Sequence, residues 1–322
     1  MTVFAGSGSE LASLIQYERD ALEFVRSVLF NQSEAAARLE IDLSAARNED
    51  GSLRGDVRLL MVGVASGDEA VRSALSRLRP LAFSAAFKLQ DMIVEWVLRA
   101  NGSTAWRFQA KIQEYERMKR TARLCEPPGF VNRGALSDTF WALYSALARF
   151  RNKIIHKGSF SVLGTTLTIA DGPDILQLTD AEQGAYIRAL CLLADGLMSS
   201  AIPDASVFII ENDLHQLSSI HNVTGLNQRP VRLASITATG TGRAVEDGRL
   251  EATIDFDEIR RCAEKSFPIV GGIVLFDLRL IIRVGIRQAT WAFPVGAAPT
   301  GVVQIVEGNS RFEPYRAAEA LQ

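Results

Sequence analysis

Apolar residues recur every three or four positions through the first 200 residues, the spacing of amphipathic helices. In residues 9–30, for example, Leu11, Leu14, Ile15 and Leu22 fall on one helical face. Capping and breaking residues divide this part of the chain further. We expect five helices: residues 9–30, a helix opening at Ser33 and Ala35–Ala37, one from Asp68 that bends or restarts at Pro80 and ends near Gly102, one over 104–124, and one over 137–157 that Gly158 stops.

After Gly158 the hydrophobic pattern becomes mixed. Residues 160–163 and 166–169 are expected to form a short hairpin, and Thr179 or Asp180 to cap a last helix that runs through Met198. From about residue 228 the period of the pattern changes to two, which is typical of strands. Alternating apolar and polar residues predict strands over 250–256 and 276–284, with one helix over 257–267 between them.

These patterns predict a mainly α protein in which a helical bundle is followed by a smaller α+β domain. We place the helical domain at residues 1–200, a linker at 201–228 and the α+β domain, of unknown role, at 229–322.

Composition narrows the class of protein. The 48% hydrophobic content is that of a folded globular chain. Cys125, Cys191 and Cys262 lie far apart with no CxxC spacing, which argues against a disulfide framework or a zinc ribbon. The longest apolar run, residues 269–284, contains charged residues at strand spacing, so we expect no membrane span. Because residues 1–10 have no basic and apolar signal pattern, we expect a cytoplasmic protein.

Charge is concentrated in one segment of the chain. Residues 104–157 carry a net charge of +7, whereas residues 1–103 carry −3 and residues 158–322 carry −6. A basic segment in an otherwise acidic chain indicates a local phosphate-binding surface, although a solvated helix face has the same composition. The candidate RNA-binding residues are Arg117, Lys119, Arg120, Arg123, Lys153 and Lys157.

The last predicted helix of this segment carries the candidate chemistry. Arg151 falls in the middle of an apolar stripe, so its guanidinium needs an anion, a partner chain or an open groove. Asn152 and His156 lie four residues apart on an adjacent face. Arg151 and His156 are separated by about 140° around an ideal helix. They meet only if the last turn unwinds or a second copy supplies one of them.

The hexapeptide Arg151-Asn152-Lys153-Ile154-Ile155-His156, followed by Lys157-Gly158, resembles the Arg-polar-x3-His signature of the HEPN superfamily over about residues 70–200. The resemblance implies a helical domain that dimerises through this region. It also implies a metal-independent ribonuclease without cofactor, of the kind found in toxin–antitoxin and antiviral defence systems. Arg151, His156 and Asn152 would be the catalytic residues. Members regulated by a nucleotidyltransferase often carry a tyrosine two residues after the histidine, and Gly158 stands at that position here, so the resemblance does not extend to regulation through such a tyrosine.

The residue types suit cleavage of RNA. The 2′-hydroxyl is the nucleophile, an imidazole can move its proton, and an arginine can hold the charge that develops on the phosphate. We therefore expect an endoribonuclease that acts as a homodimer, the dimer covering part of the stripe formed by Leu147, Phe150 and Ile154. An antitoxin or a defence-system protein is a further expected partner.

Three alternatives stay open. A non-catalytic HEPN-like module would bind a protein partner or regulate transcription instead of cleaving RNA. Within the domain, Arg151 could pair with a carboxylate while His156 only caps carbonyl groups. Finally, His215 and His221 lie near Glu211 and Asp213, which is a weak metal-binding arrangement, and surface histidines are the better interpretation.

Overall fold

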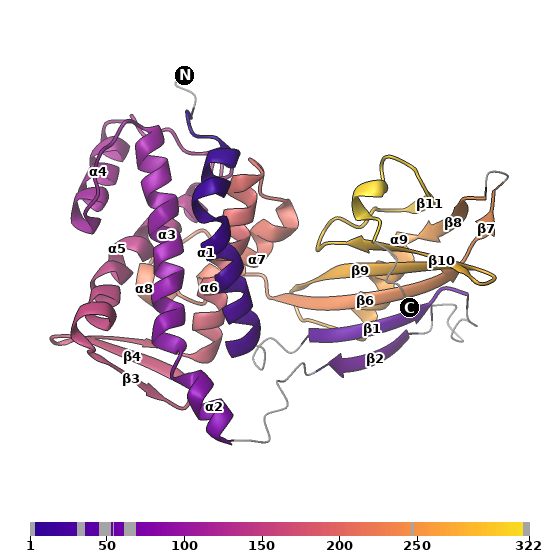
Figure 1. Cartoon of the computed structure of the whole chain (residues 1–322), viewed down its shortest axis with the longest axis horizontal. Coiled ribbons are helices and arrows are strands. Elements are labelled where there is room, and N and C mark those ends of the chain that lie inside the picture. The colour runs from indigo at the N-terminus through magenta and orange to yellow at the C-terminus, as the bar shows by residue number, and fades with distance from the viewer. Residues whose placement is uncertain are drawn as a thin grey trace. The chain divides into compact units, whose positions relative to one another are not determined.

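The computed structural model describes residues 4–30, 36–44, 53, 55–60, 69–245 and 248–317. The chain forms two compact units (Figure 1). The helical unit consists of Met1–Glu34 and Gly63–Gln228, and the sheet unit consists of Ala35–Val62 and Arg229–Gln322. Each unit is therefore built around its own hydrophobic core.

The prediction of a mainly α protein is wrong, because the described residues form a mixed α+β protein with sheets of five, three and three strands. The helix expected from Ser33 onward is one source of the error. Ala36 and Ala37 begin strand β1 (Ala36–Asp42), while Ser33 and Ala35 lie outside the described residues. Alanine favours a helix locally, but β1 pairs with β2 and with the distant strand β6, and this long-range pairing outweighs the local preference.

The helical unit follows the predicted helices closely. Of the bend or restart expected at Pro80, the structure shows a restart, with Pro80 in the first turn of α3, and Gly158 ends α5 in the left-handed conformation with φ 59°. The helices are α1 (Gly8–Leu29), α2 (Glu69–Ser76), α3 (Arg79–Ala100), α4 (Phe108–Arg120), α5 (Gly134–Lys157), α6 (Asp180–Met198), α7 (Asp204–His215) and α8 (Ser218–His221). The segment 201–228, expected to be a linker, holds α7 and α8, and Ile210 and Leu214 are buried in the helical core.

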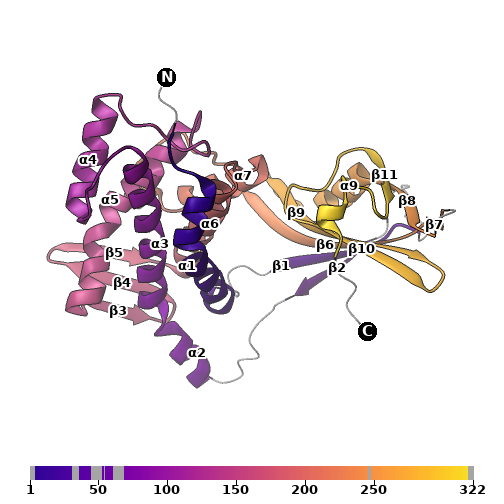
Figure 2. The same cartoon turned by 45° about the horizontal axis from the view of Figure 1, so that its top comes forward.

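A small antiparallel sheet completes the helical unit. Its strands β3 (Phe160–Leu163), β4 (Thr166–Asp171) and β5 (Asp174–Leu178) follow α5 directly, and β3 and β4 form the predicted hairpin. Figure 2 shows this sheet at the end of the bundle where α5 ends. Leu167, Ile169, Leu176 and Leu178 point into the core shared with the helices.

The sheet unit contains a five-stranded sheet in the order β10-β9-β6-β1-β2. β6 runs parallel to both β1 and β9, while the outer pairs are antiparallel. A second sheet has the order β11-β8-β7. The elements are β2 (Gly55–Leu60), β6 (Val231–Thr241), β7 (Arg243–Ala244), β8 (Leu250–Asp255), α9 (Phe256–Ser266), β9 (Ile273–Val284), β10 (Arg287–Phe293), β11 (Val302–Val306) and the short helix η1 (Glu313–Tyr315). The predicted strands and helix over 250–284 are confirmed.

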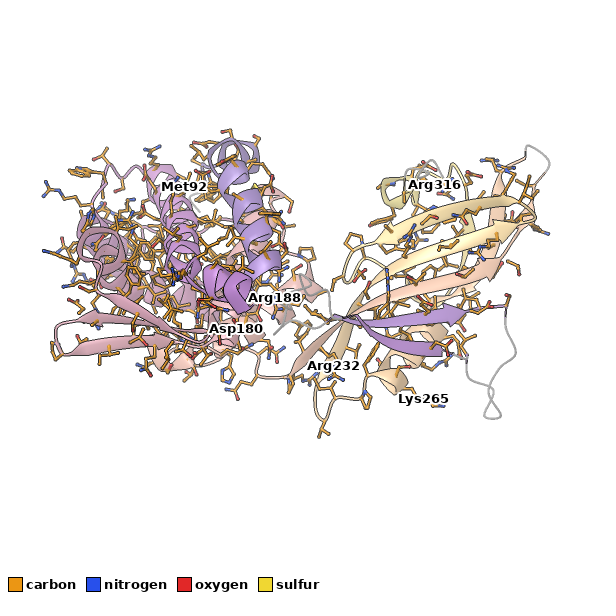
Figure 3. The ribbon with its side chains drawn as sticks, turned by 60° about the horizontal axis from the view of Figure 1, so that its bottom comes forward. Met92, Asp180, Arg188, Arg232, Lys265 and Arg316 are labelled. Carbon is orange, nitrogen blue, oxygen red and sulfur yellow. The ribbon has the colours of Figure 1, made fainter. Side chains whose placement is uncertain are left out.

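Buried ion pairs tie the helices of the bundle together. Arg188 donates two hydrogen bonds to the fully buried carboxylate of Asp213, at 2.8 Å from Nε and 2.6 Å from Nη2. Arg79 pairs with Asp180 at 2.5 Å. Asp180 and Arg188, labelled in Figure 3, both lie on α6, so these pairs join α6 to α3 and α7. Within the described residues, no helix is both long and apolar enough to cross a membrane.

Candidate functional site

The helix α5 carries the Arg-Asn-x3-His motif in its last two turns. The helix is continuous from Gly134 to Lys157, and the N–H of Gly158 closes its end on the carbonyl of Lys153. The last turn therefore does not unwind. Arg151 and His156 stay about 140° apart around one helix, and a single chain presents them in different directions.

Arg151 is half-buried against α4. Its guanidinium carbon lies 5.4 Å from the centre of the Phe108 ring, and its Nη1 donates to Oδ1 of Asn152 at 3.3 Å. Its Nε is buried without a hydrogen-bond partner. Asn152 thus holds one edge of the guanidinium while the Phe108 ring supports its plane, and the positive charge itself is not neutralised.

This lack of a carboxylate sets Arg151 apart in the helical unit. Of the arginine and lysine side chains described as buried or half-buried in this unit, Arg151 is the one without a carboxylate partner among the described residues. The others form ion pairs: Arg19 with Asp195, Arg26 with Glu23, Arg79 with Asp180, Lys111 with Asp91 and Glu95, Arg133 with Asp204, Lys153 with Asp171, and Arg188 with Asp213. The alternative in which Arg151 pairs with a carboxylate inside the domain is therefore wrong for the described residues.

His156 is exposed in the last turn of α5. The residues of α5 that the sequence assigned to a dimer interface are, in contrast, already used by the chain itself. Leu147, Phe150 and Ile154 are 1%, 4% and 7% exposed and belong to the helical core. The expectation that a dimer covers this stripe is wrong, because its side chains are already buried where α5 packs against α3 and the small sheet. The apolar side chain that α5 does expose beside His156 is Ile155, at 45%.

The basic segment is partly neutralised by its own fold. Arg117 pairs with Glu114, Lys119 with Asp138, and Lys153 with Asp171. Three of the six candidate RNA-binding residues therefore already have a carboxylate partner. Arg120, Arg123 and Lys157 are exposed and have none among the described residues. These three, together with Arg107 and Arg151, are the uncompensated cations of residues 104–157.

A buried polar network beneath Arg151 was not predicted from the sequence. The ammonium of Lys111, on α4, is 1% exposed and lies 2.8 Å from Asp91 and 3.0 Å from Glu95, both on α3. The hydroxyl of Tyr144 donates to Asp91 at 2.5 Å, and burial, followed by the charge of Asp91, raises the pKa of Tyr144. This network fixes α4 on α3 and α5, and so fixes Phe108 under the guanidinium of Arg151. The signal in the sequence was the lysine at an apolar position of α4.

His221 is buried and not on the surface as expected, and it has a structural role. Nε2 of His221 lies 2.9 Å from the carbonyl oxygen of Leu214, and its Nδ1 accepts a hydrogen bond from the N–H of Val223. Asp213 is held by Arg188. In the part of the chain that the structure describes, no three histidine, cysteine, aspartate or glutamate side chains gather as metal ligands would.

Comparisons of this chain with protein-family models, curated proteins and solved structures found no match.

Proposed function

We propose that the helical unit is a HEPN-like, metal-independent endoribonuclease that cleaves RNA as a homodimer. The observation that carries the proposal is the half-buried guanidinium of Arg151, which is supported by Phe108 and Asn152 and has no carboxylate partner among the described residues. A desolvated cation without an internal counter-ion binds an external anion strongly. A phosphodiester is an anion whose oxygens match the guanidinium fork.

The proposed reaction needs only groups that this chain and RNA supply. His156 accepts the proton of a 2′-hydroxyl as its oxygen attacks the adjacent phosphorus. The bond from the 2′-oxygen to phosphorus forms, the bond from phosphorus to the 5′-oxygen breaks, and the proton that His156 accepted passes to that leaving oxygen. Arg151 holds the charge on the non-bridging oxygens, and Asn152 orients Arg151. The products end in a 2′,3′-cyclic phosphate and a 5′-hydroxyl.

The geometry of α5 favours a site shared between two chains. Because one chain presents Arg151 and His156 in different directions, a two-fold axis beside the end of α5 would bring Arg151 of one protomer near the partner's His156. Exposed Ile155, with Phe160 and Leu163 of β3, would form the apolar part of this contact. We place the dimer in the cytoplasm, with an antitoxin or defence-system protein as its partner.

Cleavage of a labelled RNA in the presence of EDTA tests the activity. Arg151→Ala and His156→Ala should each abolish cleavage, whereas His215→Ala, which removes the histidine in the last turn of α7, should leave it unchanged. Cleavage that survives both α5 substitutions would refute the proposal. A wild-type chain that cleaves no RNA would also refute the proposal and would favour the non-catalytic HEPN-like module.

Mixing the two inactive variants tests the shared site. If each site takes Arg151 from one protomer and His156 from the other, every mixed dimer keeps one intact site, and an equal mixture recovers about a quarter of wild-type activity. If each site lies within one chain, the mixture stays inactive. Ile155→Glu should give a folded, inactive monomer by light scattering, whereas Ile154→Glu should unfold the helical unit, because Ile154 is buried.

A further inference from the structure

One large aromatic side chain near Arg151 is left mostly exposed. Trp106 is 72% exposed, whereas Trp96, Trp141 and Trp291 are 3%, 4% and 1% exposed. An indole ring carries a large apolar surface, and leaving most of it in water is unfavourable. The exposed indole of Trp106 is therefore available to a ligand that would cover the ring.

The packing of α4 on α5 brings Trp106 to the end of α4 that contacts Arg151. The two helices run antiparallel, since Lys119 pairs with Asp138 at one end of α4 and Phe108 contacts Arg151 at the other. Trp106 precedes Phe108 by two residues, a reach of at most about 7 Å along the backbone. It therefore lies near the contact between the Phe108 ring and the guanidinium of Arg151.

A cation already occupies one side of the Trp106 ring. The guanidinium carbon of Arg107 lies 4.7 Å from the ring centre, and Arg107 has no carboxylate partner among the described residues. An exposed indole flanked by an uncompensated arginine is suited to a group that is both aromatic and anionic. A nucleotide combines these properties in one residue, because its base stacks on the ring while its phosphate meets the guanidinium.

We propose that Trp106 and Arg107 form a base-stacking platform that selects single-stranded RNA for the motif of α5. This inference rests on the proposed function, because it names the substrate class of that same site. A duplex cannot use the platform, since its base faces are covered by neighbouring pairs, whereas a single strand offers an open face at every nucleotide. Binding should therefore discriminate strongly between single and double strands and only weakly among base sequences.

Intrinsic fluorescence of the full chain provides the test. Trp106 is the exposed tryptophan, so its emission is the red-shifted part of the spectrum, and stacking of a base should quench it. The probe is a single-stranded 2′-O-methyl oligouridine, which lacks the nucleophile and is not cleaved. The same strand paired with its oligoadenosine complement should leave the emission unchanged.

Variants separate stacking of a base on Trp106 from non-specific attraction of the strand to the protein. Trp106→Ala should weaken binding of the single strand about 5- to 140-fold, the range that corresponds to 1–3 kcal/mol for one stacked base. Trp106→Phe should retain most of the affinity. The matched control is Phe24→Ala, which removes a 70%-exposed aromatic ring from α1 and should change nothing.

The outcomes separate this inference from the proposed function. Quenching by the single strand without RNA cleavage would support the platform and refute the nuclease. Cleavage with no quenching, or with an affinity that Trp106→Ala does not alter, would overturn the platform and leave the nuclease intact. If the chain neither cleaves RNA nor shows quenching, both are refuted.

Discussion

Replacing Arg151 with methionine should remove RNA cleavage while leaving the stability of the helical unit nearly unchanged. The matched control is Arg188→Met, which alters another half-buried arginine of the same bundle. The two side chains differ in one respect that matters here. Arg188 is paired in a bidentate manner with buried Asp213, and Arg151 has no carboxylate partner among the described residues.

The contacts of Arg151 set the expected magnitude. Methionine loses the contact with Phe108, worth about 0.5–1 kcal/mol, and the 3.3 Å hydrogen bond to Asn152, worth about 0.5–1.5 kcal/mol. It also removes the buried Nε that has no partner, which returns about 1–3 kcal/mol. These contributions offset one another, so the free energy of unfolding should stay within about 2 kcal/mol of the wild-type value.

Arg188→Met should behave differently, because it leaves the carboxylate of Asp213 buried without its main counter-ion. Breaking such a pair costs about 3–5 kcal/mol, which for a unit of this size lowers the melting temperature by about 6–20 °C. Urea and thermal unfolding followed by far-ultraviolet circular dichroism measure both variants. If Arg151→Met lost as much stability as Arg188→Met, Arg151 would have an internal partner, and the reasoning that assigns it to an external phosphate would fail.

Two further predictions concern the frame around the site. Burial lowers the pKa of His221 in the folded chain, so the stabilisation by its neutral imidazole is present above the unfolded pKa of 6.5 and is lost as the pH falls through the folded pKa. The free energy of unfolding should therefore decline on acidification from about pH 7.5 to 5.5. An equal decline in His221→Gln would contradict this prediction. Gly158→Ala should destabilise the helical unit by about 1 kcal/mol because φ is 59°, whereas Gly134→Ala, at the ordinary backbone conformation that begins α5, should not; equal unfolding midpoints for the two variants would show that the left-handed cap carries no strain.

The helices were predictable from the sequence because their information is local. The breaks at Pro80 and Gly158 define the start of α3 and the end of α5, whereas α5 begins three residues before the predicted start at 137. β1 was not predictable in this way, since its partners are β2 and β6, and an alanine-rich start suggests a helix. Segment 201–228 was misjudged for a related reason. The apolar face of α7 is too short for its period to stand out, although Ile210 and Leu214 reach the core.

The candidate site was predictable in its residue types and not in its surroundings. The position of Arg151 within an apolar stripe correctly indicated a guanidinium that is partly desolvated. The charge count could not reveal that Lys119 and Lys153 are paired, because Asp138 and Asp171 reach them through the folding of α4 onto α5 and of β4 onto α5. Likewise, the exposure of Trp106 is a property of the packing of α4 and has no pattern in the sequence.

The route of the chain through its two units has a consequence for biosynthesis. Ala37 of β1 pairs with Ala234 of β6, 197 positions later, and all residues of the helical unit are made before β6 emerges. At 5–20 residues per second, β1 waits about 10–40 s for this partner. During that interval the helical unit can fold on the ribosome while the hydrogen-bonding edge of β1 is unpaired. Chaperones that cover strand edges should therefore engage nascent chains of intermediate length, and removing residues from 229 onward should leave β1 and β2 as an aggregation-prone remnant attached to a folded helical unit.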